Sequence, residues 1–533
     1  MYRTLKILLI SFVLIQLNAQ ELELGKSYQQ YSKALACFVN VLNYDKNNSE
    51  AYYFLGKYYL IKNDIDSAEK YFTQGIEKNE DDLLNYVGMT GVALLRNDST
   101  TVDDLLAKLI DQGEREPETF AELADIFHLI GNPYNKKGIS FLTSPEIEFE
   151  KNDMFYLNLG NLYLSVNKAS EARESYQNAL DINKNLAAAY LGIGEVYLRI
   201  NAYKDAEEYL KKALQVNSSF TPVYNSFADL YNDTKQYDKA VESYEKYLAS
   251  CERDSTKLSK YATLLFLDKK YKEAIKIITE NENQGTLSAQ DLHILSYCYY
   301  YTDNYSEGIP AFLKYAKLNT SKEFSSNDYE FLGKLYEKSG KDSMAINCLL
   351  QAIDLDSTKY GLHGDIALIY IKDKKWESAA KHFKLKNEIG KNKLNIREYF
   401  EYGRALMLTK DFMDADSLFS KIILTYPDLP LAYLMKARAR ASIDTTSEEG
   451  LAKPYYENFI ELAENSKDIS KYKRDLIEAH SYLGYFYFLK KESKEFESEW
   501  KDRYRKNWNK VLILDPNNEQ AQEAIKNIPK FKT

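Results

Sequence analysis

The chain has 533 residues, and its 79 acidic and 70 basic side chains give a formal net charge of −9. Glycine (21) and proline (10) are scarce, which argues against collagen-like, low-complexity and turn-rich all-β structures and favours long helices with short connections. The mild acidity, with both charge signs interspersed, argues against a nucleic-acid-binding protein, which requires a basic surface.

The first predicted element is an N-terminal export signal. Arg3 and Lys6 precede an apolar run over 7–17, and Ala19 supplies the small residue before a cleavage site. This layout is typical of a secretory signal peptide, and the run is too short to span a membrane. We therefore predict that 1–19 is a signal peptide and that the mature chain is exported, soluble, and periplasmic or secreted. No Cys follows the run, so we expect no lipid anchor. The alternative is a buried first helix.

A 34-residue period organises most of the chain. One series of small residues runs Gly160, Gly194, Ala228, Ala262 and Ser296. A second series, Ala172, Ala206, Ala240, Ala274 and Gly308, is followed four positions later by Tyr176, Leu210, Tyr244, Ile278 and Phe312. Within each period, large residues spaced by three and four predict two amphipathic helices joined by a short polar turn. Because one such pair cannot bury its apolar faces alone, the pairs must stack into a solenoid.

This pattern resembles the tetratricopeptide repeat (TPR), in which a large residue precedes L-G-x-x-Y, A-x-x-x-F-x-x-A and a Pro-containing turn. The match is clear at Tyr52, Leu55, Gly56, Tyr59, Ala68 and Phe72, with Tyr52 in the place of the family's Trp. The resemblance implies an all-α, right-handed superhelical solenoid of stacked antiparallel helix pairs, with about fourteen repeats and a C-terminal capping helix. It also implies a concave groove, lined by the first helices, that holds peptides or partner helices.

The repeats differ in regularity along the chain. We predict N-terminal repeats over 20–81, degenerate repeats over 82–150, a regular array over 151–320, a C-terminal array over 321–516 with insertions near 443–450 and 488–505, and a capping helix and tail over 517–533. The degenerate part lacks a good second-helix signature. The stretch from Lys490 to Trp508 is dense in charge and carries Trp500 and Trp508, which is typical of an exposed helical extension.

No motif predicts catalysis. Metalloprotease, phosphate-loop, nucleophile-elbow and Ca²⁺-loop patterns are all missing from the sequence. The histidines are His128, His293, His363, His382 and His480, and no two are spaced as ligands on one helix. Cys37, Cys251, Cys298 and Cys348 form no C-x-x-C pair, so we expect buried thiols. We predict no enzyme, no catalytic residue, no cofactor and no metal. The alternative is an enzyme whose site lies in 82–150 or around 490–508.

Three groups of first-helix residues are predicted to line the partner-binding groove. They are an acidic stretch (Glu195, Asp229, Asp233), an aromatic stretch (His293, Tyr297, Tyr300, Tyr301) and a basic stretch (Arg397, Arg404, Arg438). The aromatic stretch is the favoured site, because exposed Tyr supplies large contact area at low entropy cost. The alternatives are that Tyr297 and Tyr300 pack between neighbouring helices and that the charged residues form ordinary solvated faces.

The predicted function is a non-catalytic protein–protein interaction scaffold or adaptor. It binds a partner protein or peptide in the concave groove after export across the inner membrane, with no nucleic acid involved. The alternative is a holdase-like chaperone or carrier for exported clients. The Lys/Asn arrangement with which some TPR domains clamp a terminal carboxylate does not occur in consecutive repeats, so that function is not inferred. Scattered surface residues set partner identity, and the sequence does not supply it.

Overall fold

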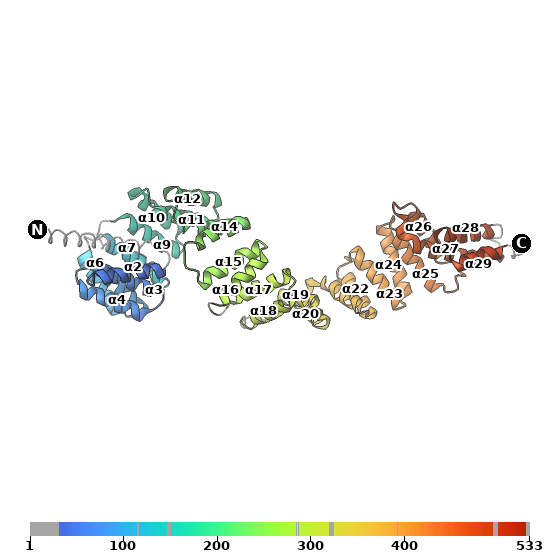
Figure 1. Ribbon diagram of the computed structural model, residues 1–533, viewed down its shortest axis with the longest axis horizontal. Coiled ribbons are helices and arrows are strands. Elements are labelled where there is room, and N and C mark those ends of the chain that lie inside the picture. The colour runs from blue at the N-terminus through green and yellow to red at the C-terminus, as the bar shows by residue number, and fades with distance from the viewer. Residues whose placement is uncertain are drawn as a thin grey trace, which may run out of the picture. The chain divides into compact units, whose positions relative to one another are not determined.

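The computed structural model describes residues 31–113, 117–145, 151–283, 285, 287–318, 324–391, 393–493 and 499–528. Every regular element in these ranges is a helix, which confirms the predicted all-α class (Figure 1). The chain divides into two compact units, Met1–Asp303 (unit 1) and Asn304–Thr533 (unit 2). The predicted signal peptide lies outside the described residues.

Unit 1 contains α2 (Tyr31–Tyr44), α3 (Ser49–Ile61), α4 (Ile65–Lys78), α5 (Leu83–Leu95), α6 (Ser99–Gly113), α7 (Pro117–Ile130), α8 (Tyr134–Leu142), α9 (Asp153–Ser165), α10 (Ala169–Ile182), α11 (Ala187–Arg199), α12 (Tyr203–Val216), α13 (Val223–Asp233), α14 (Tyr237–Leu248), α15 (Ser255–Leu267), α16 (Tyr271–Glu282) and α17 (Ala289–Tyr301). Unit 2 contains α18 (Tyr305–Leu318), α19 (Ser326–Lys338), α20 (Asp342–Leu355), α21 (Leu362–Lys372), α22 (Trp376–Ile389), α23 (Ile396–Leu408), α24 (Phe412–Thr425), α25 (Pro430–Ile443), α26 (Lys453–Glu464), α27 (Lys473–Leu489), α28 (Trp500–Leu514) and α29 (Glu519–Asn527), with short 3₁₀ segments at Ser357–Lys359, Ile469–Tyr472 and Lys490–Glu492.

Consecutive helices pack as pairs, and the pairs stack. In unit 1 the pairs run from α3/α4 to α15/α16, and in unit 2 from α19/α20 to α27/α28. First helices of successive pairs also contact one another, as in α9, α11 and α13. The first helices therefore form a row, and the predicted solenoid of stacked helix pairs is confirmed.

The turn inside each repeat uses a residue in the left-handed backbone region. Positive φ angles near 60° recur in steps of 34 residues at Asn167, Asn201, Lys235, Lys269 and Asp303. Such a residue reverses the chain directly after the first helix, where Asn and Gly are the least strained. Asn97 and Gly131 show the same spacing in the irregular 82–150 part, whose described residues fold into the pairs α5/α6 and α7/α8.

Glycines on the first helices leave room for large side chains of the second helices. A Cβ atom at Gly160 of α9 or at Gly192 of α11 would lie 2.5 Å from the ring of Tyr176, which is fully buried on α10. Phe72 of α4 is enclosed in the same way by Gly56 of α3 and Gly88 of α5. Each ring therefore packs against two successive repeats, which explains the spacing between the small and large residues.

The last repeat keeps this contact despite its insertion. Gly403 and its partner Phe419 are separated by sixteen residues, whereas Gly484 and its partner Trp508 are separated by twenty-four. The eight added residues lie between α27 and α28. Trp500 and Trp508 are only 8% and 3% exposed, so the expectation of an exposed helical extension is wrong at these two side chains. They belong to the core because α28 packs along α27.

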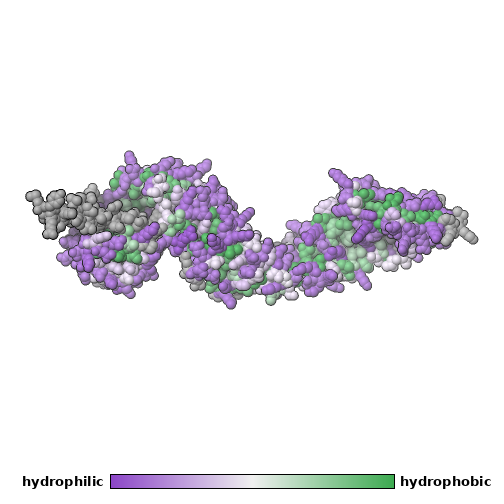
Figure 2. All heavy atoms as spheres, viewed as in Figure 1, coloured by the Kyte–Doolittle hydropathy of each residue, from purple (hydrophilic) through white to green (hydrophobic). Residues whose placement is uncertain are grey.

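The buried residues form a chain of small cores between the helices. Fully buried aromatic rings include Tyr53, Phe72, Tyr176, Tyr244 and Phe312. On the face seen in Figure 2, hydrophilic residues cover most of the surface and hydrophobic ones occur in separate patches. In the part of the chain that the structure describes, no helix has the length and apolar character needed to cross a bilayer.

Candidate functional site

A cavity of about 490 Å³ opens on the row of first helices in unit 1. It lies between α13, α15 and the start of α17, and its walls carry hydroxyl, amide and charged groups. The lining residues are Asp229, Asn232, Ser255, Thr256, Ser259, Lys260, Thr263, Leu264, Leu267, Ser288 and Gln290. We call this cavity and the adjoining aromatic residues of α17 the first-helix site.

The predicted acidic stretch contains a cation. Lys260 Nζ lies 2.6 Å from Asp229 Oδ1 and donates a hydrogen bond to Asn225 Oδ1 at 2.8 Å. Glu195 on α11 accepts a hydrogen bond from Ser226 Oγ at 2.8 Å, and burial raises the pKa of this carboxyl above its ordinary value. The surface is therefore of mixed charge at this point.

Asp233, the third acidic residue, ends α13 and is exposed. The only hydrogen bond to its carboxylate within the described residues is a long one, 3.5 Å, from the side chain of the neighbouring Asn232. Its charge is therefore available to a partner.

The predicted aromatic stretch bridges neighbouring helices and remains partly exposed. Tyr297 packs edge-on against Phe266 of α15, with ring centroids 6.1 Å apart, and His293 packs edge-on against Tyr297 at 5.0 Å. Tyr301 stacks on Tyr271 of α16 at 4.7 Å while staying 52% exposed. These rings serve the helix packing and leave part of their area exposed on α17.

Tyr300 is the fourth member of the aromatic stretch. Its ring meets that of Tyr301 edge-on, with centroids 5.5 Å apart, and it is half-buried. His293, Tyr297, Tyr300 and Tyr301 thus form one continuous group on α17.

The predicted basic stretch lies in unit 2, on α23 and α25. Arg397 is exposed at the start of α23. Arg404 covers the ring of Trp376 at 5.4 Å and pairs with Glu401 at 3.2 Å.

Arg438 differs from these two because the chain itself satisfies its charge. Its guanidinium lies 2.8 Å from Asp475 and 2.6 Å from Glu478, and Glu478 also accepts a hydrogen bond from the Tyr456 hydroxyl. The Glu478 hydrogen bonds raise the pKa of Arg438 above its ordinary value. Arg438 therefore holds α25 to α27.

Lys260, Thr263 and Gln290 were not among the predicted site residues. Thr263 stands one 34-residue step after Asp229 and one before Tyr297, so the repeat spacing contained the signal that locates it. Gln290 donates to Thr263 Oγ1 at 3.3 Å and links α17 to α15. Lys260 and Asp229 belong to successive repeats but occupy different positions within the repeat. The 34-residue spacing alone therefore does not reveal that they pair.

The described residues contain no group of three or more His, Cys, Asp or Glu side chains arranged to hold a metal ion. All four cysteines are buried, and burial raises the pKa of Cys298 to about 12 and that of Cys348 to about 11. These groups remain protonated thiols at neutral pH, which makes them poor nucleophiles. His363 and His382 do meet, with Nδ1 atoms 3.0 Å apart, although they are nineteen residues apart in the chain.

Comparisons with known proteins match the repeat architecture. Two family models described as tetratricopeptide repeat match residues 154–219 and residues 49–82 and 329–359. A third, described as anaphase-promoting complex, cyclosome, subunit 3, matches residues 233–315. No curated protein matches the chain.

Several solved structures are similar. The C-terminal part of a TPR repeat-containing protein from Cytophaga hutchinsonii is 30% identical, over 50% of this chain and 99% of that chain, with a TM-score of 0.41. YrrB, described as a TPR protein with an unusual peptide-binding site, is 18% identical over 38% of this chain and 99% of its own, with a TM-score of 0.32. A tetratricopeptide repeat protein from Parabacteroides merdae is 17% identical over 54% and 98%, with a TM-score of 0.29.

Stacked helix pairs with a row of first helices define a helical-repeat protein, a class that presents extended surfaces to other molecules. The family within this class is identified by the two tetratricopeptide repeat models and by the Cytophaga relative. The contacts between glycines and rings agree with it. The chain belongs to the tetratricopeptide repeat family.

Proposed function

We propose that this protein is a non-catalytic interaction scaffold that binds an extended segment of a partner protein at the first-helix site. The observation that carries the proposal is the mixed-charge cavity at the start of α17, the helix that also carries the partly exposed tyrosines. Asp229, Lys260 and Gln290 offer an anion, a cation and an amide along one wall, and Tyr301 adds exposed aromatic area. Hydrogen-bonding groups of both kinds beside aromatic rings suit a polypeptide, whose backbone carries donors and acceptors alternately.

A partner with a basic residue next to an acidic one suits the charges best. Its cation would pair with Asp233, and its carboxylate would meet Lys260, which lines the cavity. The basic residues Arg397 and Arg404 of unit 2 offer a second contact for acidic residues of the partner. We also propose that the protein acts after export, on the basis of the N-terminal 1–19 pattern.

Cross-linking in the native host tests the site. A photo-reactive residue at Gln290, which is exposed on the site, is expected to form an adduct with one partner, whereas the same residue at Lys276, exposed on the second helix α16, is expected to form none. Equal adducts from both positions would place binding elsewhere.

A variant pair separates binding from folding. Lys260→Ala with Gln290→Ala removes side chains at the cavity wall, and we expect recovery of the partner to fall at least about tenfold, as for loss of a central interface group. The matched control is Lys276→Ala with Gln177→Ala on second helices, which should bind normally. Unchanged recovery with the cavity variant contradicts the proposal.

The chaperone alternative makes a different prediction. A holdase suppresses the aggregation of several unrelated unfolding proteins, whereas a scaffold enriches one partner. Light scattering of heated citrate synthase and reduced insulin, with and without the full chain, distinguishes the two. Fractionation of the host tests export, because protein that keeps residues 1–19 in the cytoplasm would refute it.

A further inference from the structure

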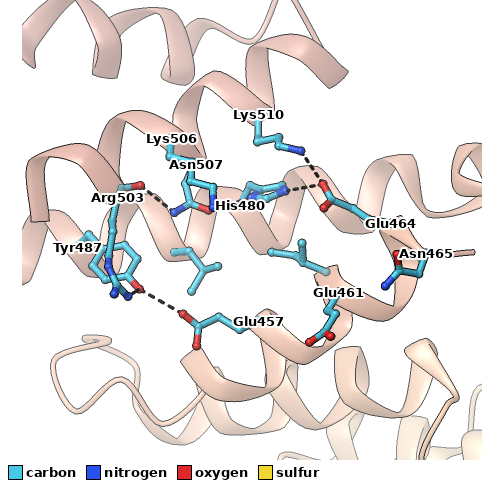
Figure 3. A pocket seen from close by; sticks show the side chains of 12 residues that line it. Glu457, Glu461, Glu464, Asn465, His480, Tyr487, Arg503, Lys506, Asn507 and Lys510 are labelled. Carbon is cyan, nitrogen blue, oxygen red and sulfur yellow. Dashed lines mark hydrogen bonds and ion pairs between the residues drawn. The ribbon is translucent and has the colours of Figure 1, made fainter. Parts of the chain in front are cut away.

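A separate cavity lies in unit 2 between α26 and the last helix pair, α27/α28. Its volume is about 410 Å³. Three helices form it in a regular way: α26 supplies an acidic wall, α28 a basic wall and α27 the floor between them (Figure 3). The wall residues are Glu457, Glu461 and Glu464 on α26 and Arg503, Lys506 and Lys510 on α28, with His480, Leu483 and Tyr487 on the floor.

Both ends of the cavity are closed by contacts between the walls. At one end Lys510 Nζ pairs with Glu464 Oε1 at 2.8 Å. At the other, the Tyr487 hydroxyl donates to Glu457 at 3.2 Å and accepts from Arg503 at 3.0 Å (Figure 3). A ligand must therefore fit between these two contacts, which limits its extent along the helices.

The middle of each wall carries a charge that the chain does not compensate. Glu461 and Lys506 are exposed, and neither forms an ion pair or a side-chain hydrogen bond among the described residues. Counting the six charged residues of the walls, three carboxylates face three cations, so the cavity has no net charge. A ligand with a single charge satisfies one wall and leaves the other unmatched.

One buried acceptor on the floor, His480 Nε2, has no hydrogen-bond donor among the described residues. His480 is 6% exposed, and its Nδ1–H donates to Asn507 Oδ1 at 2.8 Å, which makes Nε2 an acceptor. Nε2 has no hydrogen-bond partner among the described residues, and Glu464 Oε1, 4.0 Å away, is also an acceptor. An ammonium group held by Glu461, one helical turn from Glu464, brings a donor to this side of the cavity, where a buried acceptor lacks one.

We propose that this cavity binds a small zwitterion with an ammonium group at one end, a carboxylate at the other and a short apolar chain between them. The ammonium group pairs with Glu461 on the acidic wall, the carboxylate with Lys506 on the basic wall, and the apolar chain covers Ile460 and Leu483. The closed ends exclude an extended polypeptide, and the volume lies in the range of small-molecule sites. This site is independent of the scaffold function proposed for unit 1.

Calorimetric titration of the full chain with 6-aminohexanoate tests the proposal. We expect saturable binding with a dissociation constant of about 1 mM or tighter, which corresponds to a weak specific complex. Hexanoate and hexylamine each carry one of the two charges on a similar chain, and both should bind at least about tenfold more weakly. An isotherm without binding heat for 6-aminohexanoate overturns the proposal, and equal binding of hexanoate overturns the zwitterion preference.

Two neutral variants locate the site. Glu461→Gln and Lys506→Gln change exposed side chains without partners, so the fold should persist, and each should weaken 6-aminohexanoate binding about tenfold. The matched controls are Glu449→Gln and Lys421→Gln, also exposed in unit 2, which should bind as the unaltered chain does. Circular dichroism checks folding. Unaltered binding by both wall variants places the ligand elsewhere and refutes the assignment.

Discussion

Replacing Gly88 by alanine tests whether neighbouring repeats are locked together by shared rings. A Cβ atom at Gly88 would lie 2.2 Å from Cε1 of Phe72, and Gly56 presses on the same ring from the preceding first helix. Phe72 is fully buried, so its ring cannot move away. Alanine improves helix propensity by about 1 kcal/mol. Overpacking costs roughly 1–3 kcal/mol, more where neighbours cannot yield. Because the buried ring cannot yield, the upper part of this range, about 2–3 kcal/mol, applies, and we expect a net loss of about 1–2 kcal/mol.

Hydrogen exchange of the full chain measures this loss locally. Stability in a repeat protein is a sum of local and nearest-neighbour terms, so the effect should stay near the altered repeat. Exchange in α3–α5 should accelerate about tenfold, the factor that 1.4 kcal/mol represents. Exchange in α11 and α12 should not change.

Two further variants complete the test. Adding Phe72→Leu should relieve the Gly88→Ala clash, so the two changes together cost less than their sum. Gly361→Ala serves as the matched control, because no atom lies within 4 Å of the added Cβ. The reasoning is refuted if hydrogen exchange in α3–α5 is as slow with Gly88→Ala as in the unaltered chain. It is also refuted if Gly361→Ala accelerates exchange in its own repeat by the same factor.

Three other changes test local features. Lys269→Gly relieves a positive-φ turn residue and should stabilise by roughly 0.5–1 kcal/mol in thermal unfolding, whereas Lys272→Gly, at an exposed position of α16, should destabilise by about 1 kcal/mol. Burial lowers the pKa of His382 to about 4, so the unfolded chain binds the extra proton between about pH 6.5 and pH 4. Stability should therefore fall as pH drops through this window, and urea midpoints of His382→Gln should show a smaller fall. Lys436→Met leaves the buried Asp416 carboxylate short of one partner and should cost about 3 kcal/mol, more than Lys436→Met with Asp416→Leu. A single variant as stable as the double would contradict this.

The repeat architecture was predictable because the residues that determine it lie close together in the sequence and recur in each repeat. The positions of Ala206 and Leu210 recur every 34 residues. Both residues contact Gly194, which belongs to the same helix pair. Even the insertion in the last repeat was visible as extra residues between Tyr487 and Trp508. The burial of Trp508 was not, because a dense run of charges around it dominated the local pattern.

The site chemistry was less predictable because it depends on contacts between repeats. Tyr297 and Tyr301 were identified on α17, but the sequence does not show that Tyr301 stacks on Tyr271. Lys260 neutralises Asp229 from the next first helix, which changes an acidic surface into a mixed one. His363 and His382 meet across a helix pair, beyond the spacing of three or four that marks neighbours on one helix.

The shared rings determine where this chain tolerates changes of length. Both insertions, near 443–450 and between α27 and α28, fall in the turn between the two helices of one repeat, and the contact between Gly484 and Trp508 survives the second. Evolution or engineering can thus graft new loops at the intra-repeat turns and leave the contact between glycine and ring in place.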